Sequence, residues 1–128
     1  MGRTVAGADG APLHVEIDGR DPAPVTVVLS HGWTLDGRTW GPVTRALVAG
    51  RAPVRVLRPD HRGHGRSAAV DPATMTLEQL ADDLAAVIAA LAPDGPLVLA
   101  GHSMGGMTSV TLALRHPDLV ERMVLLCP

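Results

Sequence analysis

Aromatic residues and cysteine are scarce in this chain. Its 128 residues contain no phenylalanine and no tyrosine, two tryptophans and a single cysteine. One cysteine, Cys127, excludes a disulfide within the chain, and we expect it to be a small buried hydrophobic residue. Because Trp33 and Trp40 are the only large aromatic side chains, the core must consist of Val, Leu, Ala, Ile and Met. A nucleic-acid site that stacks bases on aromatic rings is disfavoured for the same reason.

Strong charge and long hydrophobic runs are also missing. The formal net charge of -2 offers no electrostatic attraction for nucleic acid or for an anionic membrane. The longest uncharged apolar stretch, residues 84–92, is far shorter than the roughly 20 residues of a membrane span, and residues 1–10 contain no signal-peptide core. We therefore expect one cytoplasmic domain, residues 1–128, that binds neither nucleic acid nor membrane.

Short apolar runs between glycines and prolines predict the secondary structure. β-Branched residues and alternation indicate strands at residues 13–17, 25–30, 54–57, 97–100 and 122–127. Helical spacing predicts helices at residues 40–50, from residue 76 to an end at 93–95, and at residues 104–115. Thr76 with Gln79 three residues later has the capping-box pattern. The third helix is apolar on nearly all sides, so we expect it to be buried.

Strands that alternate with helices predict the fold class. Parallel strands joined by right-handed crossovers form an α/β architecture, here an open doubly wound, mostly parallel sheet. Ligand sites in such sheets lie at the carboxyl ends of the strands. The loops to search therefore begin at Ser30, Arg58 and Gly101.

A serine between two glycines follows the strand at residues 97–100. Gly101-His102-Ser103-Met104-Gly105 has the G-x-S-x-G pattern of a nucleophile raised on a strained turn between strand and helix. Side chains at Gly101 and Gly105 would collide with neighbouring backbone in such a turn. The helix that begins at Met104 directs unpaired N–H groups toward the site, where they stabilise a developing negative oxygen.

A second glycine turn follows the strand at residues 25–30. In Ser30-His31-Gly32-Trp33, glycine at 32 lets the backbone fold so that the N–H of Trp33 faces Ser103 as a second oxyanion donor. We expect His31 to stabilise this loop through a hydrogen bond and to take no direct part in chemistry.

Four segments in order resemble the α/β-hydrolase superfamily. They are SHGW (30–33), RPDHRGHGRS (58–67), AGHSMGG (100–106) and RMVLLCP (122–128). The resemblance implies a nucleophilic Ser103, backbone N–H groups of Trp33 and Met104 as the oxyanion hole, and no cofactor or metal. A serine at this position is similar to esterases, lipases, lactonases, carbon–carbon hydrolases and perhydrolases, whereas epoxide hydrolases and haloalkane dehalogenases have aspartate.

The acid and the histidine of the superfamily's triad come on strands later than residues 122–127, which would form the sixth of eight strands. The resemblance therefore implies the N-terminal part of a hydrolase domain, truncated after about the sixth strand, without the lid, the acid or the base. His102 is expected to point away from Ser103, and His31, His61 and His64 are expected to shape loops.

The segment at residues 61–67 also has other interpretations. His61 and His64 could bind a metal, but no third ligand is evident, and the lysine of a phosphate loop is absent. We interpret the segment as a turn held by Asp60, Arg62 and Arg66.

Two hypotheses of function follow. In the first, the protein hydrolyses ester-like or other acyl small molecules through an acyl-enzyme on Ser103. In the second, it is a non-catalytic, truncated hydrolase fold that serves as a binding or interaction remnant. The substrate, the reaction subclass and the oligomeric state stay open.

Overall fold

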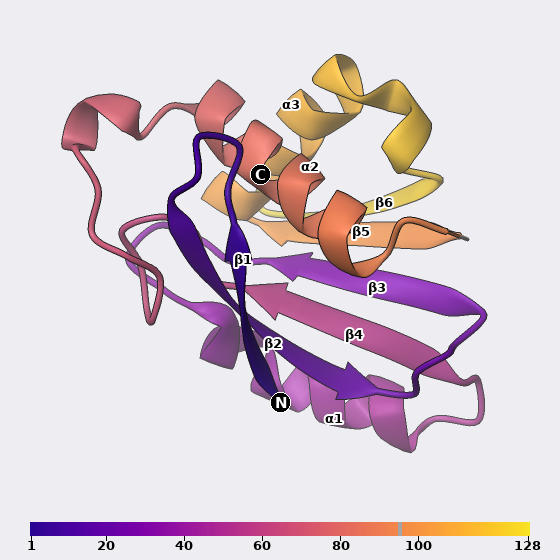
Figure 1. Ribbon diagram of the computed structural model, residues 1–128. Coiled ribbons are helices and arrows are strands. Elements are labelled where there is room, and N and C mark those ends of the chain that lie inside the picture. Colours follow the sequence, from indigo (N-terminus) through magenta and orange to yellow (C-terminus); the bar gives the residue numbers. More distant parts are fainter. Residues whose placement is uncertain (95) are drawn as a thin grey trace.

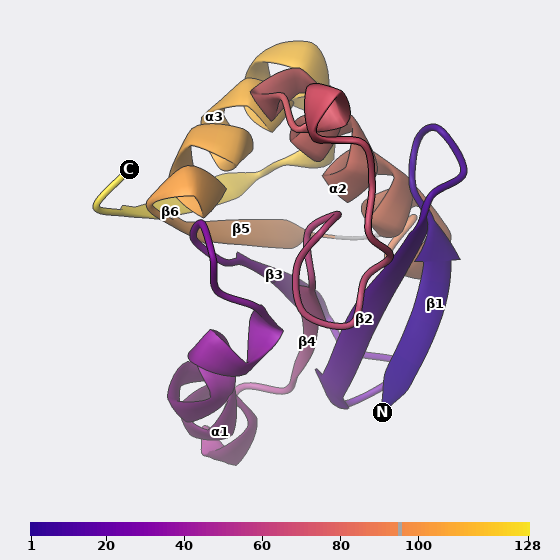
Figure 2. The same cartoon turned by 90° about the vertical axis from the view of Figure 1, so that its left-hand side faces the viewer.

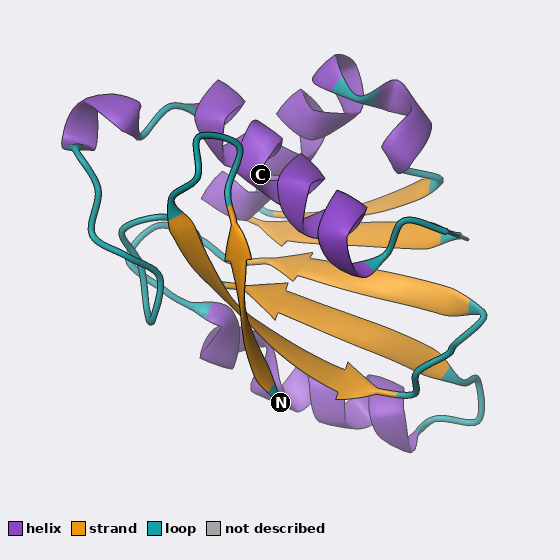
Figure 3. Ribbon diagram, in the orientation of Figure 1, coloured by secondary structure: helices purple, strands orange, loops and turns teal. Residues whose placement is uncertain are grey.

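Residues 1–94 and 96–128 are described by the computed structural model, and they form one sheet flanked by helices. The sheet contains strands β1 (Gly2–Ala6), β2 (Pro12–Gly19), β3 (Val25–Ser30), β4 (Val54–Pro59), β5 (Leu97–His102) and β6 (Arg122–Leu126). The α-helices are α1 (Gly41–Ala49), α2 (Leu77–Leu91) and α3 (Met104–Arg115) (Figures 1 and 3). Each predicted strand and helix is present. The predicted end of the second helix at 93–95 includes residue 95, which lies outside the described residues.

The strand order is β1-β2-β4-β3-β5-β6. Strands β4, β3, β5 and β6 are parallel to one another, whereas β2 pairs antiparallel with both β1 and β4. The expected α/β sheet, mostly parallel, is confirmed. Strand β1 was not predicted, because its sequence GRTVA mixes glycine and charge and its residues are largely exposed at the sheet edge. Its backbone pairing with β2 holds it in place.

Helices cover both faces of the sheet. Figure 2 shows α1 on one side and α2 with α3 on the other. Alternate residues of the central strands point to opposite sides: Val28 and Leu99 join the cluster under α2, whereas Val27 and Leu29 join the cluster with Trp40 near α1. Burial on both faces explains why Val27, Val28 and Leu29 follow one another without a polar residue.

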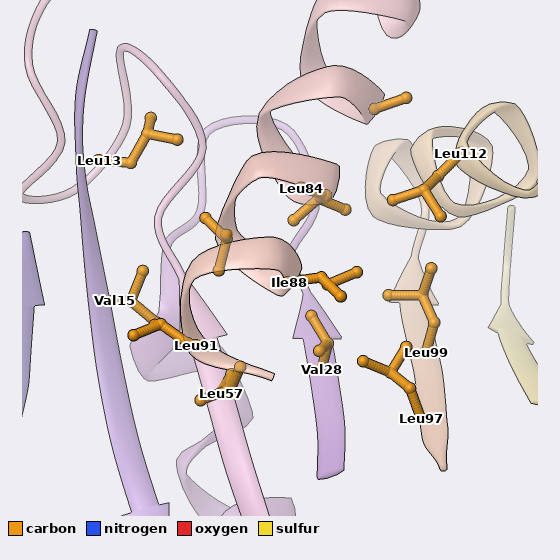
Figure 4. Close-up of a cluster of buried hydrophobic side chains, with 12 residues drawn as sticks. Leu13, Val15, Val28, Leu57, Leu84, Ile88, Leu91, Leu97, Leu99 and Leu112 are labelled. Atoms are coloured by element: carbon orange, nitrogen blue, oxygen red, sulfur yellow. The ribbon is translucent and has the colours of Figure 1, made fainter. Parts of the chain in front are cut away.

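The larger cluster lies between α2 and the sheet (Figure 4). Leu84 and Ile88 of α2 pack with Leu57, Val28 and Leu99 of three neighbouring strands. The helix begins with an N-terminal cap, in which the Thr76 hydroxyl accepts a hydrogen bond of 3.1 Å from the Gln79 N–H. The acceptor half of the predicted capping box is therefore present.

Two sequence predictions about burial are wrong. Helix α3 is not buried all round, because the sheet and α2 contact one side only and leave Met107, Val110 and Leu114 exposed. Its covered side carries Met104, Leu112 and four small residues, and the small residues allow close packing. Cys127 is exposed, since it directly follows β6 at the edge of the sheet.

None of the helices in residues 1–94 and 96–128 combines the length and the hydropathy that a membrane crossing requires.

Candidate active site

The two glycine turns meet at the carboxyl ends of the parallel strands β3 and β5. Strands β3 and β5 are parallel neighbours, with Ser30 opposite Gly101. The loops that follow these strands therefore leave the sheet side by side, at the edge where the arrowheads of β3 and β5 lie in Figure 1. The predicted proximity of the Gly32 loop and the Ser103 turn is confirmed.

Ser103 has an unfavourable backbone conformation. It lies between the last residue of β5 and the first of α3, with φ of 52° and ψ of -117°. Positive φ places a side chain against its own backbone and costs about 1–3 kcal/mol for residues other than glycine. The carbonyl of Ser103 accepts the first helical hydrogen bonds, from the N–H groups of Gly106 at 2.8 Å and Met107 at 3.1 Å.

The glycines around Ser103 are required by close backbone approach. A Cβ atom at Gly101 would lie closer than 3.0 Å to the carbonyl oxygen of Gly105. A Cβ atom at Gly105 would lie 2.6 Å from the carbonyl oxygen of His31 and closer still to that of Ser30. Glycine at both positions therefore lets the start of α3 press against the ends of β3 and β5.

Two backbone N–H groups of the two glycine turns form no hydrogen bond with an acceptor in the described residues. They belong to Trp33 and Met104, the pair that the sequence assigns to an oxyanion hole. The Met104 N–H is also at the N-terminus of α3, where the helix carries a partial positive charge of about half a unit. Backbone donors without an acceptor are what an oxyanion hole requires.

His31 holds the peptide group that carries the Trp33 N–H. Its Nδ1 donates a hydrogen bond of 2.7 Å to the Gly32 carbonyl oxygen, which also accepts the Leu35 N–H at 3.2 Å. In a planar trans peptide the carbonyl and the N–H point in opposite directions, so an anchored Gly32 carbonyl orients the Trp33 N–H. Gly32 itself lies beside His102, whose Nδ1 would be 3.1 Å from a Cβ atom there.

The neighbouring contacts determine the tautomer of His31. Its Nε2 accepts a hydrogen bond of 2.9 Å from the backbone N–H of His61, so the ring is neutral with its proton on Nδ1. The Nε2 of His61 in turn lies 2.8 Å from the Ser30 hydroxyl. Burial lowers the pKa of His31 and lowers that of His61 well below its usual value.

These two buried rings predict a loss of stability in mild acid. The folded protein holds both rings neutral, whereas the unfolded chain binds a proton on each near pH 6.5. The free energy of unfolding is therefore unaffected by these two rings above pH 6.5. Below pH 6.5 it decreases by up to about 1.4 kcal/mol per pH unit for each ring, because only the unfolded chain binds the protons. We expect a lower free energy of unfolding in urea at pH 5.5 than at pH 7.5.

The carboxylates of Asp9 and Asp36 do not contribute to the difference in free energy of unfolding between pH 5.5 and pH 7.5. Hydrogen bonds from Arg62 and Arg38 lower the pKa values of Asp9 and Asp36 to about 2, so the stability they confer is lost only between pH 3.8 and pH 2. Equal free energies of unfolding at pH 5.5 and 7.5 would show that His31 and His61 are not held neutral.

Asp60 joins two loops, as its predicted role requires. Its Oδ1 accepts the Gly37 N–H at 2.7 Å and its Oδ2 accepts the Arg66 N–H at 2.9 Å. The side chain of Arg66 does not hold the turn, because it extends outward to pair with Glu16 at 2.8 Å. Asp60 is 5% exposed, so these hydrogen bonds are shielded from water.

Arg62 acts at a longer range than the sequence suggested. Its guanidinium, 1% exposed, donates from Nε to Asp83 Oδ2 at 2.6 Å and from Nη2 to Asp83 Oδ1 at 2.9 Å. It also forms two bonds to Asp9, at 3.0 and 2.8 Å, and both carboxylates raise its pKa. Arg62 thus ties the loop after β4 to α2 and to the β1–β2 turn. Sequence reasoning missed Asp83, which differs from a surface helical acid only by lying on the buried side of α2.

The histidines of residues 61–67 are occupied by hydrogen bonds. Besides the His61 contacts, His64 lies 3.0 Å from the Arg62 carbonyl and 3.2 Å from the Thr34 N–H. Within residues 1–94 and 96–128, no group of three His, Cys, Asp or Glu side chains is arranged to hold a metal. No histidine in the same part of the chain forms a hydrogen bond with Ser103. The Nδ1 of His102 is buried and has no partner there.

A hollow of about 420 Å³ lies beside the Trp33 loop. Its lining combines apolar side chains with the turn glycines after β4, and it includes Trp33, Leu35, Gly63, His64, Val70, Pro72 and Met75. Trp33 is 59% exposed, so its indole forms part of the open surface of this hollow.

Comparison with known proteins places this geometry in context. Residues 25–128 match the family described as alpha/beta hydrolase fold. The chain is 42% identical over 113 residues to the putative carbamate hydrolase RutD of Yersinia enterocolitica, covering 88% of this chain and 39% of that protein. It is 37% identical over 116 residues to the lipase LipV of Mycobacterium tuberculosis, covering 91% and 41%. The chain thus spans about two fifths of the length of these relatives.

Solved structures of hydrolases have a fold similar to that of this chain. An esterase from Exiguobacterium antarcticum superposes with a TM-score of 0.86 and 30% identity, covering 98% of this chain and 44% of that one. An epoxide hydrolase from Vigna radiata superposes with a TM-score of 0.86 and 29% identity, covering 98% and 37%.

Proposed function

The chain belongs to the alpha/beta hydrolase family, and from this membership we propose that Ser103 is the nucleophile of a hydrolase for ester-like or other acyl substrates. One observation carries the proposal: Ser103 lies on a strained strand-to-helix turn, and this turn and the neighbouring Gly32 loop each carry a backbone N–H, of Met104 and of Trp33, that lacks an acceptor among the described residues. Strain of this kind is often found at functional sites.

The proposed reaction proceeds through an acyl-enzyme. The Ser103 Oγ attacks the carbonyl carbon of the substrate, and the carbonyl oxygen becomes an oxyanion that accepts hydrogen bonds from the Trp33 and Met104 N–H groups. Collapse of this intermediate breaks the bond to the leaving group, which departs with a proton. Water then attacks the acyl-enzyme and releases the acid, and the proton returns to Ser103.

The proton of Ser103 requires a general base within hydrogen-bond reach. His31, His61 and His64 are held by other partners, so we do not assign the base to them. In the superfamily that this chain resembles, the acid and the histidine follow on later strands. We therefore assign neither role to a residue among 1–94 and 96–128.

The substrate class follows from the nucleophile and the relatives. Relatives named carbamate hydrolase and lipase indicate substrates whose carbonyl carbon bears an oxygen or nitrogen leaving group. A serine hydroxyl with an oxyanion hole suits attack at such a carbon. The apolar part of the hollow beside Trp33 favours a substrate with a hydrocarbon portion.

A non-catalytic function is the alternative. It is favoured by one observation, the lack of a histidine hydrogen-bonded to Ser103 within residues 1–94 and 96–128. In that case the fold would bind a partner or ligand without turnover.

Labelling with a fluorophosphonate, followed by intact mass, distinguishes these functions. We expect the complete gene product to gain one adduct, the Ser103→Ala variant to gain none, and the control Ser67→Ala to label like the wild type. The same assay on residues 1–128 alone tests whether these residues by themselves supply the general base for Ser103. Labelling that persists in Ser103→Ala would exclude Ser103 as the nucleophile, and no labelling of the complete product would favour the non-catalytic function.

A further inference from the structure

Trp33 lies between two peptide groups, and a buried histidine holds each of them. The Gly32 carbonyl, on the first peptide, accepts the hydrogen bond from His31. The Thr34 N–H, on the second peptide, donates a hydrogen bond of 3.2 Å to the Nε2 of His64. Because a residue's backbone conformation is defined by the orientation of its two flanking peptide planes, His31 and His64 together restrain that of Trp33.

The contacts of His64 use both ring nitrogens. An Nε2 that accepts from the Thr34 N–H carries no proton, so the proton resides on Nδ1, which donates to the Arg62 carbonyl oxygen at 3.0 Å. The loop after β4 is itself anchored, since Arg62 is bound to Asp83 on α2. His64 therefore connects the Thr34 peptide to a loop that Arg62 fixes to α2.

Thr34 needs such support. It is a β-branched residue with φ of 65°, an uncommon and unfavourable conformation. The Leu35 N–H donates to the Gly32 carbonyl, so Gly32 to Leu35 form a turn whose third residue, Thr34, occupies a position that favours glycine or asparagine. Without the bond to His64, the turn could relax toward negative φ at Thr34 by rotation of the peptide between Trp33 and Thr34, which changes the backbone conformation of Trp33.

Ring packing adds a second restraint on the same loop. The imidazole of His64 contacts the Trp33 indole edge-on, with ring centroids 5.2 Å apart and an interplanar angle of 74°. On its other side the His31 ring lies 5.2 Å away. His64 is 9% exposed, so it has little freedom to move.

From this geometry we infer that His64 is a positioning residue of the oxyanion hole: it holds the Thr34 peptide and packs against Trp33, and thereby directs the Trp33 N–H toward the oxygen of an acyl substrate bound at Ser103. The inference rests on the proposed function, because an oxyanion donor matters only if Ser103 reacts. It assigns His64 no proton transfer and no contact with the reacting atoms.

Two substitutions separate the contacts of His64. In His64→Gln the side-chain carbonyl oxygen can occupy the place of Nε2 and accept the Thr34 N–H. In His64→Asn the amide can donate to the Arg62 carbonyl in the place of Nδ1, but it is too short to reach Thr34. His116→Asn, at the far end of α3, serves as the control for loss of a histidine.

The experiment measures kcat and KM of the complete gene product with 4-nitrophenyl acetate, per active site titrated with a fluorophosphonate. We expect His64→Asn to lower kcat by about ten- to a hundredfold with KM changed less than about twofold, since a misplaced oxyanion donor weakens transition-state binding. His64→Gln should recover most of the loss, and His116→Asn should match the wild type. Titration removes the contribution of misfolded protein.

Hydrogen exchange at the Thr34 N–H provides a readout that needs no turnover. We expect fast exchange in His64→Asn and protection in the wild type and His64→Gln. Unchanged kcat in His64→Asn, or equal losses in both His64 variants, would overturn the inference while the proposed function stands. Turnover that survives Ser103→Ala would overturn the proposed function and the catalytic inference with it, whereas the exchange result would still report whether His64 holds the loop.

Discussion

Replacing Ser103 with glycine is expected to abolish turnover and to stabilise the fold by about 1 kcal/mol, because glycine adopts the backbone conformation at this position without strain. Serine at φ of 52° carries a conformational cost that glycine avoids. Part of the gain is offset, since glycine also increases the entropy of the unfolded chain by up to about 1 kcal/mol. The nucleophile would thus be kept at the expense of stability.

Ser103→Ala is the matched variant. It removes the same hydroxyl but keeps the Cβ atom, so it should not be stabilised. Both variants should lower kcat for an activated ester by about 10⁴- to 10⁶-fold, as loss of a catalytic serine does. Urea unfolding at pH 7.5 and steady-state kinetics of the complete gene product measure the two effects. If glycine is no more stabilising than alanine, the turn at Ser103 is not strained, and substantial turnover in either variant would exclude its catalytic role.

Replacing Arg62 with methionine is expected to lower the free energy of unfolding by about 3–5 kcal/mol, the second large effect. Methionine fills a similar volume but leaves Asp83, itself 1% exposed, without its cation. The remaining donors to Asp83 Oδ1 are neutral, the Ala8 N–H and the Gln79 side-chain amide, both at 3.2 Å. They do not replace two charge-assisted bonds of 2.6 and 2.9 Å.

Two variants check this explanation by urea unfolding. Asp9→Asn removes a partner that is half exposed, so it should cost much less than Arg62→Met. Combining Arg62→Met with Asp83→Leu should recover much of the stability, because no buried charge is then left unpaired. A double variant as unstable as Arg62→Met, or a single variant as stable as the wild type, would contradict the proposed importance of the buried ion pair.

Elements with strong local patterns could be predicted. The β-branched run at residues 25–30 forms β3 as expected, and the apolar stripe after Thr76 forms α2. Predictions failed where the outcome depended on neighbours. Strand β1 has a weak pattern and is held by pairing with β2, and α3 has apolar residues on sides that no described element covers.

The candidate site also has parts that could be predicted from the sequence and parts that could not. The Ser103 turn could be predicted, because a strand, two glycines and a helix start within a few residues restrict the backbone locally. The meeting of this turn with the Gly32 loop followed from the rule that ligand sites lie at the carboxyl ends of parallel strands. The partners of Arg62 could not be predicted, since Asp9 and Asp83 are distant in sequence and come from different elements.

The sequence by itself therefore determined the α/β order of strands and helices, the glycine-flanked turn of Ser103 and the turn at Gly32, all of which depend on residues close together in the chain. Only the tertiary structure decided that His31 and His64 hold the two peptides of Trp33, that Arg62 reaches α2, and which face of α3 is exposed. The physical reason is the distance along the chain over which each effect acts. Propensity, capping and positive φ act through local sterics, whereas hydrogen-bond partners and burial are set by the segments that folding brings together.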